Sequence, residues 1–177
     1  MSPHYLLKLD PSSRRYYTVT YGDLLAPTSL GSGGSSWQGG NHSAGGGAIK
    51  LTVAGTLTVN GTLSAIGDSG GLYTGNGGGA GGSVWLNVGT LAGSGSISAN
   101  GGIGDGGSDG AGGGGRIAIT YRHKGFAGLP APGVYTNLQS ISSTVTVKGG
   151  YNTSADGPED GSIDIGQIPM GTAVYIR

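Results

Sequence analysis

Apolar and polar residues alternate from Ile49 to Val53, and this alternation predicts a β-strand with one buried face. The same pattern returns at Val84, Ile117 and Ile163. A shorter alternating stretch follows in most of the copies, so each copy predicts a longer strand and then a shorter one. The chain is therefore expected to be all-β.

These strands belong to an internal repeat. The passage AIKLTVAGTLTVNGTLSAIG, which begins at Ala48, is matched 34 residues later by the passage SVWLNVGTLAGSGSISANG. A degraded third copy begins at Arg116 and resumes at Ile141, and a half-copy opens at Ser162. A strand pair that recurs with glycines after it is typical of a β-solenoid, in which no single repeat buries its own apolar face. The sequence predicts a right-handed parallel β-helix of three to four coils with glycine-rich loops.

Alignment of the copies predicts which apolar side chains stack inside. Each expected ladder takes one residue from each successive copy, and burial of such side chains contributes roughly 1.5–3 kcal/mol each. The ladders are Ile49, Val84, Ile117 and Ile163; Leu51, Leu86, Ile119 and Ile165; Val53, Val88 and Tyr121; Leu57 and Leu91; Leu63, Ile97 and Val145; Ala65, Ala99 and Val147.

Glycine is the compositional outlier, with 42 of the 177 residues, and 32 of these fall within residues 31–115. They concentrate in segments 29–47, 67–82 and 101–115. Because glycine permits positive φ and close backbone approach, two states remain open for these segments. They either pack against one another as extended polyglycine strands or form loose loops.

Residues 1–28 are expected to form a β-hairpin that precedes a glycine-rich solenoid of residues 29–177. The hairpin either caps the first coil or pairs with a neighbouring molecule. The start of the chain lacks the basic residues and apolar core of a secretory signal. At the other end the chain finishes on a β-prone, nearly uncharged stretch. The residues expected to mediate assembly are Tyr5, Leu7, Tyr17, Val19, Tyr21, Val174 and Ile176.

The net charge is zero and only 10% of the residues are charged, which disfavours binding to nucleic acid. No run of 18 apolar residues exists, so no membrane insertion is expected. The chain has no cysteine, which excludes a disulfide framework or a thiolate metal site.

The glycine-flanked passages GGGAIKLTVAGTLTVNGTLSAIG, GGAGGSVWLNVGTLAGSGSISANGG and GGGGRIAITY resemble the glycine-rich parallel β-helix repeats of bacterial surface and adhesin-like proteins and of phage fibre proteins. The resemblance covers about residues 31–165. It implies a non-enzymatic, often multimeric protein that is extracellular, on the cell surface or part of a virion.

Candidate reactive groups are sparse. The segment GGIGDGGSDG, from Gly101, is similar to a calcium-binding nonapeptide, but its first aspartate comes one residue early and no apolar residue follows at the required place. No cofactor is expected. The candidate calcium ligands are Asp105, Asp109, Asp156 and Asp160. No triad or carboxylate pair can be identified, so the chain is not expected to be an enzyme.

Two kinds of surface are candidates for contacts. The second strand of each copy places hydroxyl residues outward, among them Thr62, Ser96 and Thr144. Such a face suits docking to another copy, binding of glycan or ordering of water; small polar residues are also common on exposed strands. The candidate stacking platforms for sugars are Trp37, Tyr73 and Trp85. We expect a non-catalytic structural or adhesive module that associates with copies of itself, as a homo-oligomer or filament, in an extracellular fibre or surface layer. The alternative is a module of the adhesin or phage tail-fibre type that binds polysaccharide or another surface, such as a cell-surface glycan.

Overall fold

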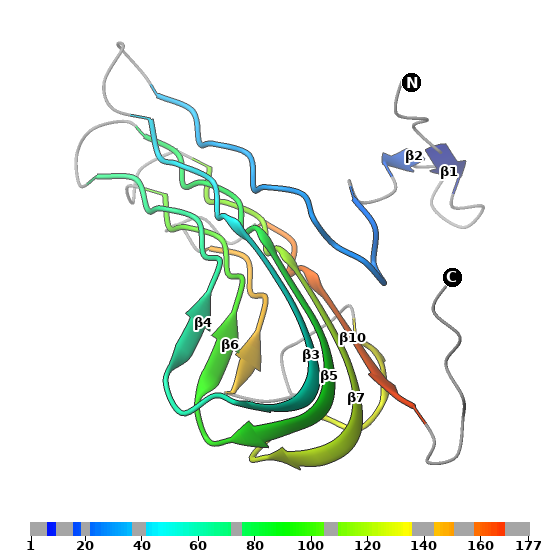
Figure 1. Ribbon diagram of the computed structural model, residues 1–177. Helices are drawn as coiled ribbons and strands as arrows, with labels where there is room; N and C mark the ends of the chain where they lie inside the picture. Colours follow the sequence, from blue (N-terminus) through cyan, green and yellow to red (C-terminus); the bar gives the residue numbers. More distant parts are fainter. Residues whose placement is uncertain are drawn as a thin grey trace.

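In a computed structural model the chain is all-β (Figure 1). The structure describes residues 7–9, 16–18, 22–36, 42–71, 76–104, 110–135, 144–150 and 158–168. None of these residues lies in a helix that is long and apolar enough to cross a membrane.

Most strands belong to one long sheet. Its parallel strands are β3 (Ala48–Thr58), β5 (Ser83–Gly93), β7 (Arg116–Phe126) and β10 (Ser162–Gln167), in that order. A short strand, β8 (Gly133–Tyr135), pairs antiparallel with the far edge of β10. Three of the four parallel strands have 11 residues each, which is long enough to curve visibly at their C-terminal ends (Figure 1).

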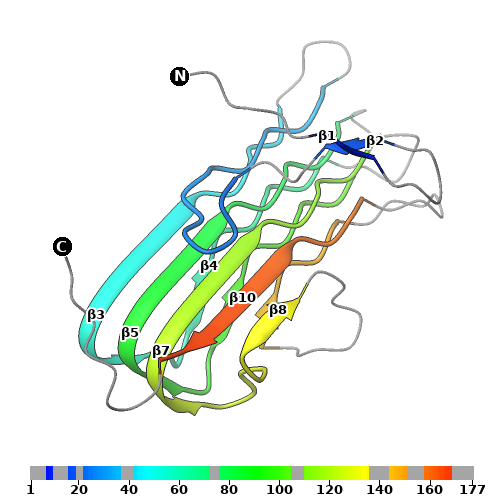
Figure 2. The same ribbon diagram turned by 90° about the vertical axis from the view of Figure 1, so that its right-hand side faces the viewer.

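A second parallel sheet faces the first. It contains β4 (Thr62–Ser64), β6 (Ser96–Ser98) and β9 (Val145–Thr146), in that order. Each of the first two repeats runs along a long strand, bends, and returns through a short strand of the opposite sheet (Figures 1 and 2). The core lies between the two sheets.

The prediction of a right-handed parallel β-helix is wrong. The parallel strands form two separate sheets of four and three strands that do not close around the core. A large part of each repeat is not strand, because the glycine segments on both sides of the strands follow another conformation. The strand pattern of the sequence is therefore correct, but it extends over only part of each repeat.

The residue ladders follow the predicted register. Ile49 pairs with Val84, Val84 with Ile117 and Ile117 with Ile163. In the short sheet, Leu63, Ile97 and Val145 lie side by side in the same way. The inward alternation of both strands in the repeat is thus confirmed.

The offset between the first two repeats is not uniform. Ala48 lies opposite Ser83, an offset of 35, whereas Thr56 lies opposite Thr90, an offset of 34. A β-bulge between Val53 and Thr56 absorbs the extra residue of β3. The single offset of 34 therefore holds only after the bulge.

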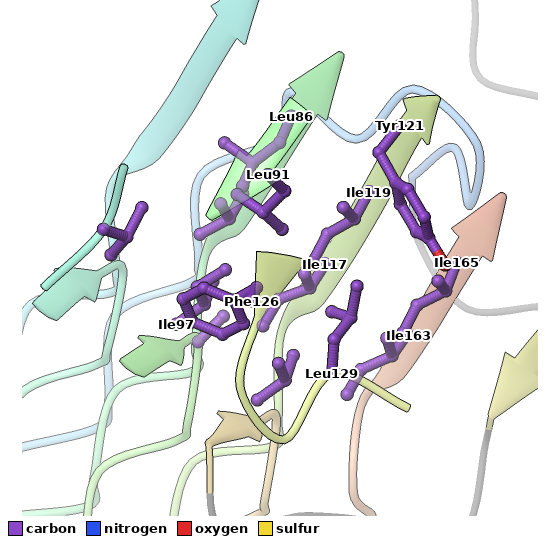
Figure 3. Close-up of a cluster of buried hydrophobic side chains, with 14 of the residues drawn as sticks. Leu86, Leu91, Ile97, Ile117, Ile119, Tyr121, Phe126, Leu129, Ile163 and Ile165 are labelled. Atoms are coloured by element: carbon purple, nitrogen blue, oxygen red, sulfur yellow. The ribbon is translucent and has the colours of Figure 1, made fainter. Parts of the chain in front are cut away.

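Apolar side chains from both sheets fill the core (Figure 3). Leu86, Leu91, Ile97 and Ile117 are fully buried. Phe126 and Leu129 are also buried, and they come from the stretch that separates the two parts of the third copy. This stretch continues β7 and turns into β8, so its apolar side chains contribute to the core.

The glycine segments lie side by side beyond the strands (Figure 1) and form a regular hydrogen-bonded array. In the segment 76–82, successive amides donate in turn to three different neighbouring segments. The amides of Gly77 and Ala80 donate to one neighbouring segment, at Ser35 and Ser32. The amides of Gly78 and Gly81 donate to a second, at residues 110 and 113, and those of Gly79 and Gly82 to a third, at residues 68 and 65.

This period of three residues is that of the polyproline II helix. A polyproline II helix is extended, has three residues per turn and no internal hydrogen bonds, and so points successive amides in three directions. The positive-φ glycines among the described residues are Gly22, Gly93, Gly128 and Gly133, all outside the array. The array glycines are thus required for a different reason: a Cβ atom at Gly79 or Gly102, for example, would overlap the carbonyl group of a neighbouring segment. Of the two states left open by the sequence, the structure has the packed one.

The N-terminal part contains two short strands, β1 (Leu7–Leu9) and β2 (Tyr16–Thr18), which pair antiparallel as expected for a hairpin. Residues 22–30 then form a strap at the outer face of the long sheet. The Ser83 hydroxyl donates to the Ser29 carbonyl over 2.7 Å, and Pro27 is buried.

Candidate functional site

The register of the long sheet places four side chains with contrasting chemistry in one row on its outer face. Lys50, Trp85, Ala118 and Asp164 occupy matching positions on adjacent strands. The Lys50 ammonium lies 4.0 Å from the centre of the Trp85 ring, a cation–π contact. Ala118 is fully buried although it faces outward, so a small residue forms the floor between Trp85 and Asp164.

Arg116 lies one row away, at the start of β7 and beside the strap. A Cβ atom at Gly22 would lie 3.0 Å from the guanidinium, so this strap residue and the side chain are close neighbours. Burial lowers the pKa of Arg116, and burial raises the pKa of Asp164. Both shifts have the same cause: the surrounding protein replaces water that would stabilise the charged form.

Arg116 lines two adjacent cavities. The larger, of about 560 Å³, lies between the strap and the glycine array. Its lining residues are Leu30, Gly31, Ser32, Ala80, Gly81, Gly114, Gly115 and Arg116. The smaller, of about 200 Å³, includes Glu159, Asp160 and Ser162. A partly buried guanidinium is a strong donor to carboxylate or sulfate groups.

Three basic residues lie on β7, namely Arg116, Arg122 and Lys124, but they do not act as one cluster. Arg122 is exposed and lies six residues along β7 from Arg116, roughly 20 Å at the rise of a strand. Lys124 is also exposed, and its ammonium donates to the Leu129 carbonyl over 2.8 Å. Only Arg116 of the three lines a cavity described here.

The predicted hydroxyl face is present on the short sheet. Thr62 and Ser96 are neighbours on β4 and β6, with 3.0 Å between their hydroxyl oxygens. The Thr146 hydroxyl donates to that of Ser98 over 3.2 Å. The residues of this face are Thr62, Ser64, Ser96, Ser98, Thr144 and Thr146. The pairs Thr62–Ser96 and Thr146–Ser98 are hydrogen bonds between neighbouring strands, so these hydroxyls stabilise the sheet as well as making the surface polar.

Of the four calcium candidates, the structure describes Asp160 alone. Asp105, Asp109 and Asp156 lie outside the described residues. The Asp160 carboxylate accepts a 2.8 Å hydrogen bond from the Gly149 amide, so it links two glycine segments. Among the described residues, no three acidic, histidine or cysteine side chains form a metal-binding group.

Several candidates for assembly and stacking also lie outside the described residues. Leu7 and Tyr17 lie in the paired strands β1 and β2, and Trp85 faces outward on β5. The others fall outside: Tyr5, Val19, Tyr21, Trp37, Tyr73, Val174 and Ile176. Their roles stay predictions.

The most informative surface, which the ladders alone did not predict, is the edge formed by β3 and β4, termed here the open edge. Among the described strands, β3 pairs with β5 alone and β4 with β6 alone. Leu51 and Leu63 are half-buried, whereas their ladder partners Leu86 and Ile97 are 0% exposed. The first repeat thus has the same inward residues as the second but lacks a described neighbour on one side.

The opposite end of the long sheet is covered. β8 pairs with Ile163–Ile165 of β10, and the buried Phe126 and Leu129 fill the core nearby. The two ends of the stack therefore differ.

Comparison with known proteins found no match among protein-family models, curated proteins or solved structures. The chemistry and packing of the residues themselves are therefore the basis for assigning a function.

Proposed function

We propose that the chain is a non-catalytic structural or adhesive module that associates with copies of itself in an extracellular fibre, surface layer or virion. The observation that carries this proposal is the glycine array. Its amides donate to neighbouring segments in three directions, so backbone hydrogen bonds connect each described segment of the array to its neighbours. Such an arrangement suits a rigid body more than a flexible linker.

The energetic cost of the array supports a mechanical role. Glycine loses more conformational entropy on folding than any other residue. Each hydrogen bond contributes a net stabilisation of only about 0.5–1.5 kcal/mol. Many glycines must therefore be ordered together for the array to be stable. The result is a stiff body with few side chains, which presents its two sheet faces in fixed positions.

Self-association can be tested by sedimentation velocity of the purified full chain over a range of concentrations, together with electron microscopy. The proposal expects a species larger than the monomer whose fraction rises with concentration. A protein that remains monomeric up to about 1 mM, far above the Kd of a specific interface, would contradict it.

Binding of an acidic polysaccharide is the second candidate function. It is favoured by Trp85 on the outer face and by Arg116 in the adjacent cavity. An aromatic ring offers a stacking surface for a sugar, and the guanidinium can pair with a uronate carboxylate.

Calorimetry with defined uronate oligosaccharides tests this second function. Arg116→Ala and Trp85→Ala should each weaken binding at least about tenfold. Arg122→Ala is the matched control, because Arg122 lies on the same strand but is exposed and distant from the cavity. Equal effects of both arginine substitutions would indicate only general charge attraction.

A further inference from the structure

Three glycines of the open edge have no structural reason to be glycine within the described part of the chain. They are Gly47, before β3, Gly55, in its bulge, and Gly61, before β4. A Cβ atom at any of them would meet no heavy atom within 4 Å. None of the three has positive φ. A side chain would therefore fit at each position.

The corresponding glycines of the second repeat are in the opposite situation. A Cβ atom at Gly82 would overlap the carbonyl oxygen of Gly47, and one at Gly95 would overlap that of Gly61. Gly89 faces the bulge, and a Cβ atom there would overlap the Ala54 carbonyl oxygen. The relation continues at Gly115, whose Cβ atom would overlap the Gly82 carbonyl. At these positions of the later repeats, glycine is needed because the backbone of the preceding repeat occupies the space that a side chain would take.

The first repeat thus has glycines suited to close backbone approach on a side where the structure describes no backbone. The burial of the apolar side chains also indicates that a further backbone segment belongs on this side. The first-repeat members of the ladders are only half-buried: Ile49, Leu51, Val53, Leu57 and Leu63. In the second repeat their partners Val84, Leu86, Val88, Leu91 and Ile97 are at most 3% exposed.

The open edge also lacks the usual protection against strand addition. Exposed edges are commonly blocked by lysine, proline or inward-pointing charges. Between residues 44 and 67 the charged residue is Lys50, and its ammonium lies over the Trp85 ring on the outer face. Lys50 lies on β3 but is turned toward Trp85 of β5 and not across the edge, and no described strand pairs with the outer side of β3 or β4.

We propose that a second copy of this chain covers the open edge, and that both copies use this same edge. This inference rests on the proposed self-association and specifies its geometry. A head-to-tail contact would require the far edge of β10, which β8 occupies over Ile163–Ile165. Two identical open edges can instead meet about a two-fold axis, which gives a closed dimer and not a filament.

In the dimer, the backbone of one copy approaches the open-edge glycines of the other. Main-chain hydrogen bonds between the two β3 strands provide affinity, as in strand addition generally. The half-buried ladder residues of both copies become covered, so one contact accounts for the glycines, the exposed apolar residues and the unprotected edge.

The first test uses bulky substitutions at positions where the isolated fold has room. Gly47→Val and Gly61→Val should leave the circular dichroism spectrum and Tm of the protein unchanged, because each side chain enters open space. Both should weaken dimerisation at least about 100-fold in sedimentation velocity. Gly110→Val is the matched control: a Cβ atom there also meets nothing within 4 Å, but the residue is not on β3 or β4, so the dimer should persist.

The second test locates the two-fold axis without altering packing strongly. The chain has no cysteine, so Thr56→Cys introduces one thiol on β3. A short bis-maleimide should link this variant into covalent dimers, and the corresponding Gly110→Cys variant should remain monomeric on denaturing gels.

The outcomes separate the inference from the proposed function. Wild-type association that neither valine substitution weakens, or filaments in place of dimers, would overturn the open-edge dimer and leave self-association standing. A wild-type protein that is monomeric at all concentrations would overturn both.

Discussion

At the residue scale, glycine serves two purposes in this protein. Gly93, for example, has φ of +109°, a conformation that side chains disfavour. Gly79 does not have positive φ, yet a Cβ atom there would overlap the Ala44 carbonyl. In the array, glycine is therefore needed chiefly because no side chain fits between adjacent backbones.

Substitution of Gly79 by alanine should lower the free energy of unfolding by about 1–3 kcal/mol or more, because backbone segments must separate to admit the methyl group. The control Gly110→Ala, in open space, should change it by less than about 0.5 kcal/mol. Urea denaturation followed by circular dichroism measures both values. Equal stability of the two variants would contradict the close packing of the array.

Asp164 should make stability depend on pH. Burial raises its pKa in the folded protein, so its protonated form is favoured by folding. The folded state then binds more protons than the unfolded state in this range, and stability falls as pH rises through the ordinary aspartate pKa to the raised one. Asp164→Asn should therefore unfold at a higher temperature than wild type near neutral pH.

The same comparison at a pH below the ordinary aspartate pKa provides the internal control. There wild type carries a neutral carboxyl group, so the gain from Asp164→Asn should disappear. Glu159→Gln, at an exposed position, controls for the general effect of removing one negative charge. A gain from Asp164→Asn that is constant with pH would argue against burial as its cause.

At the element scale, the short strand β6 shows how alternation divides inner from outer positions. Ile97 is 0% exposed, and the adjacent Ser96 faces outward, where its hydroxyl contacts that of Thr62. A shift of one residue along β6 therefore moves a side chain from the core to the surface.

Ile97→Asp should prevent folding or cost about 4 kcal/mol or more, because it buries an unpaired charge among aliphatic side chains. Ser96→Asp should cost about 1 kcal/mol, the value of one hydroxyl hydrogen bond. Native circular dichroism and equal midpoints of unfolding for both variants would mean that the assignment of faces in β6 is wrong.

The glycine segments are the second class of element, and they should resist hydrogen exchange as strands do. Each amide from Gly77 to Gly82 donates to a neighbouring segment. Mass spectrometry of a peptide covering residues 76–82 should show exchange at least about 100-fold slower than in an unstructured peptide of the same sequence. Complete exchange within seconds would show that the array opens freely in solution.

At the scale of the whole molecule, the two ends of the stack differ in a way that limits assembly. One end is closed by β8, Phe126 and Leu129, and the other leaves the open edge without a described neighbour. A body with one reactive end forms pairs more readily than chains. This asymmetry changes the expected assembly from a filament to a closed dimer.

No cleavage of neutral or acidic polysaccharides is expected from the intact protein. Arg116 and Asp164 are the described groups whose pKa values are shifted by burial. A guanidinium that stays protonated and a single carboxyl group do not make the pair of carboxyl groups that glycoside hydrolysis commonly uses. A reducing-end assay on purified protein checks this expectation. Release of reducing ends that Arg116→Ala or Asp164→Ala abolishes would show that the outer face is catalytic.

The sequence by itself determined the ladders of the core and the outward hydroxyl positions. Both follow from the period of two within each strand and from the likeness of the strand sequences between copies, which are local properties that the side chains carry. The bulge at Gly55 changed the offset by one residue but preserved the inward face, since it adds its residue between two regular stretches.

Only the tertiary structure decided that the sheets stay open, that the glycine segments form a hydrogen-bonded array and that no described strand lies beyond β3 and β4. Glycine has no side chain whose pattern could reveal its partners, and its partners here lie on segments far away in the sequence, as Gly78 and Gly110 do. The reversal into β8 likewise depends on burial of Phe126 and Leu129 against strands from other repeats. Contacts of this kind exist only once the repeats are stacked, which is why the pattern of a single repeat could not predict them.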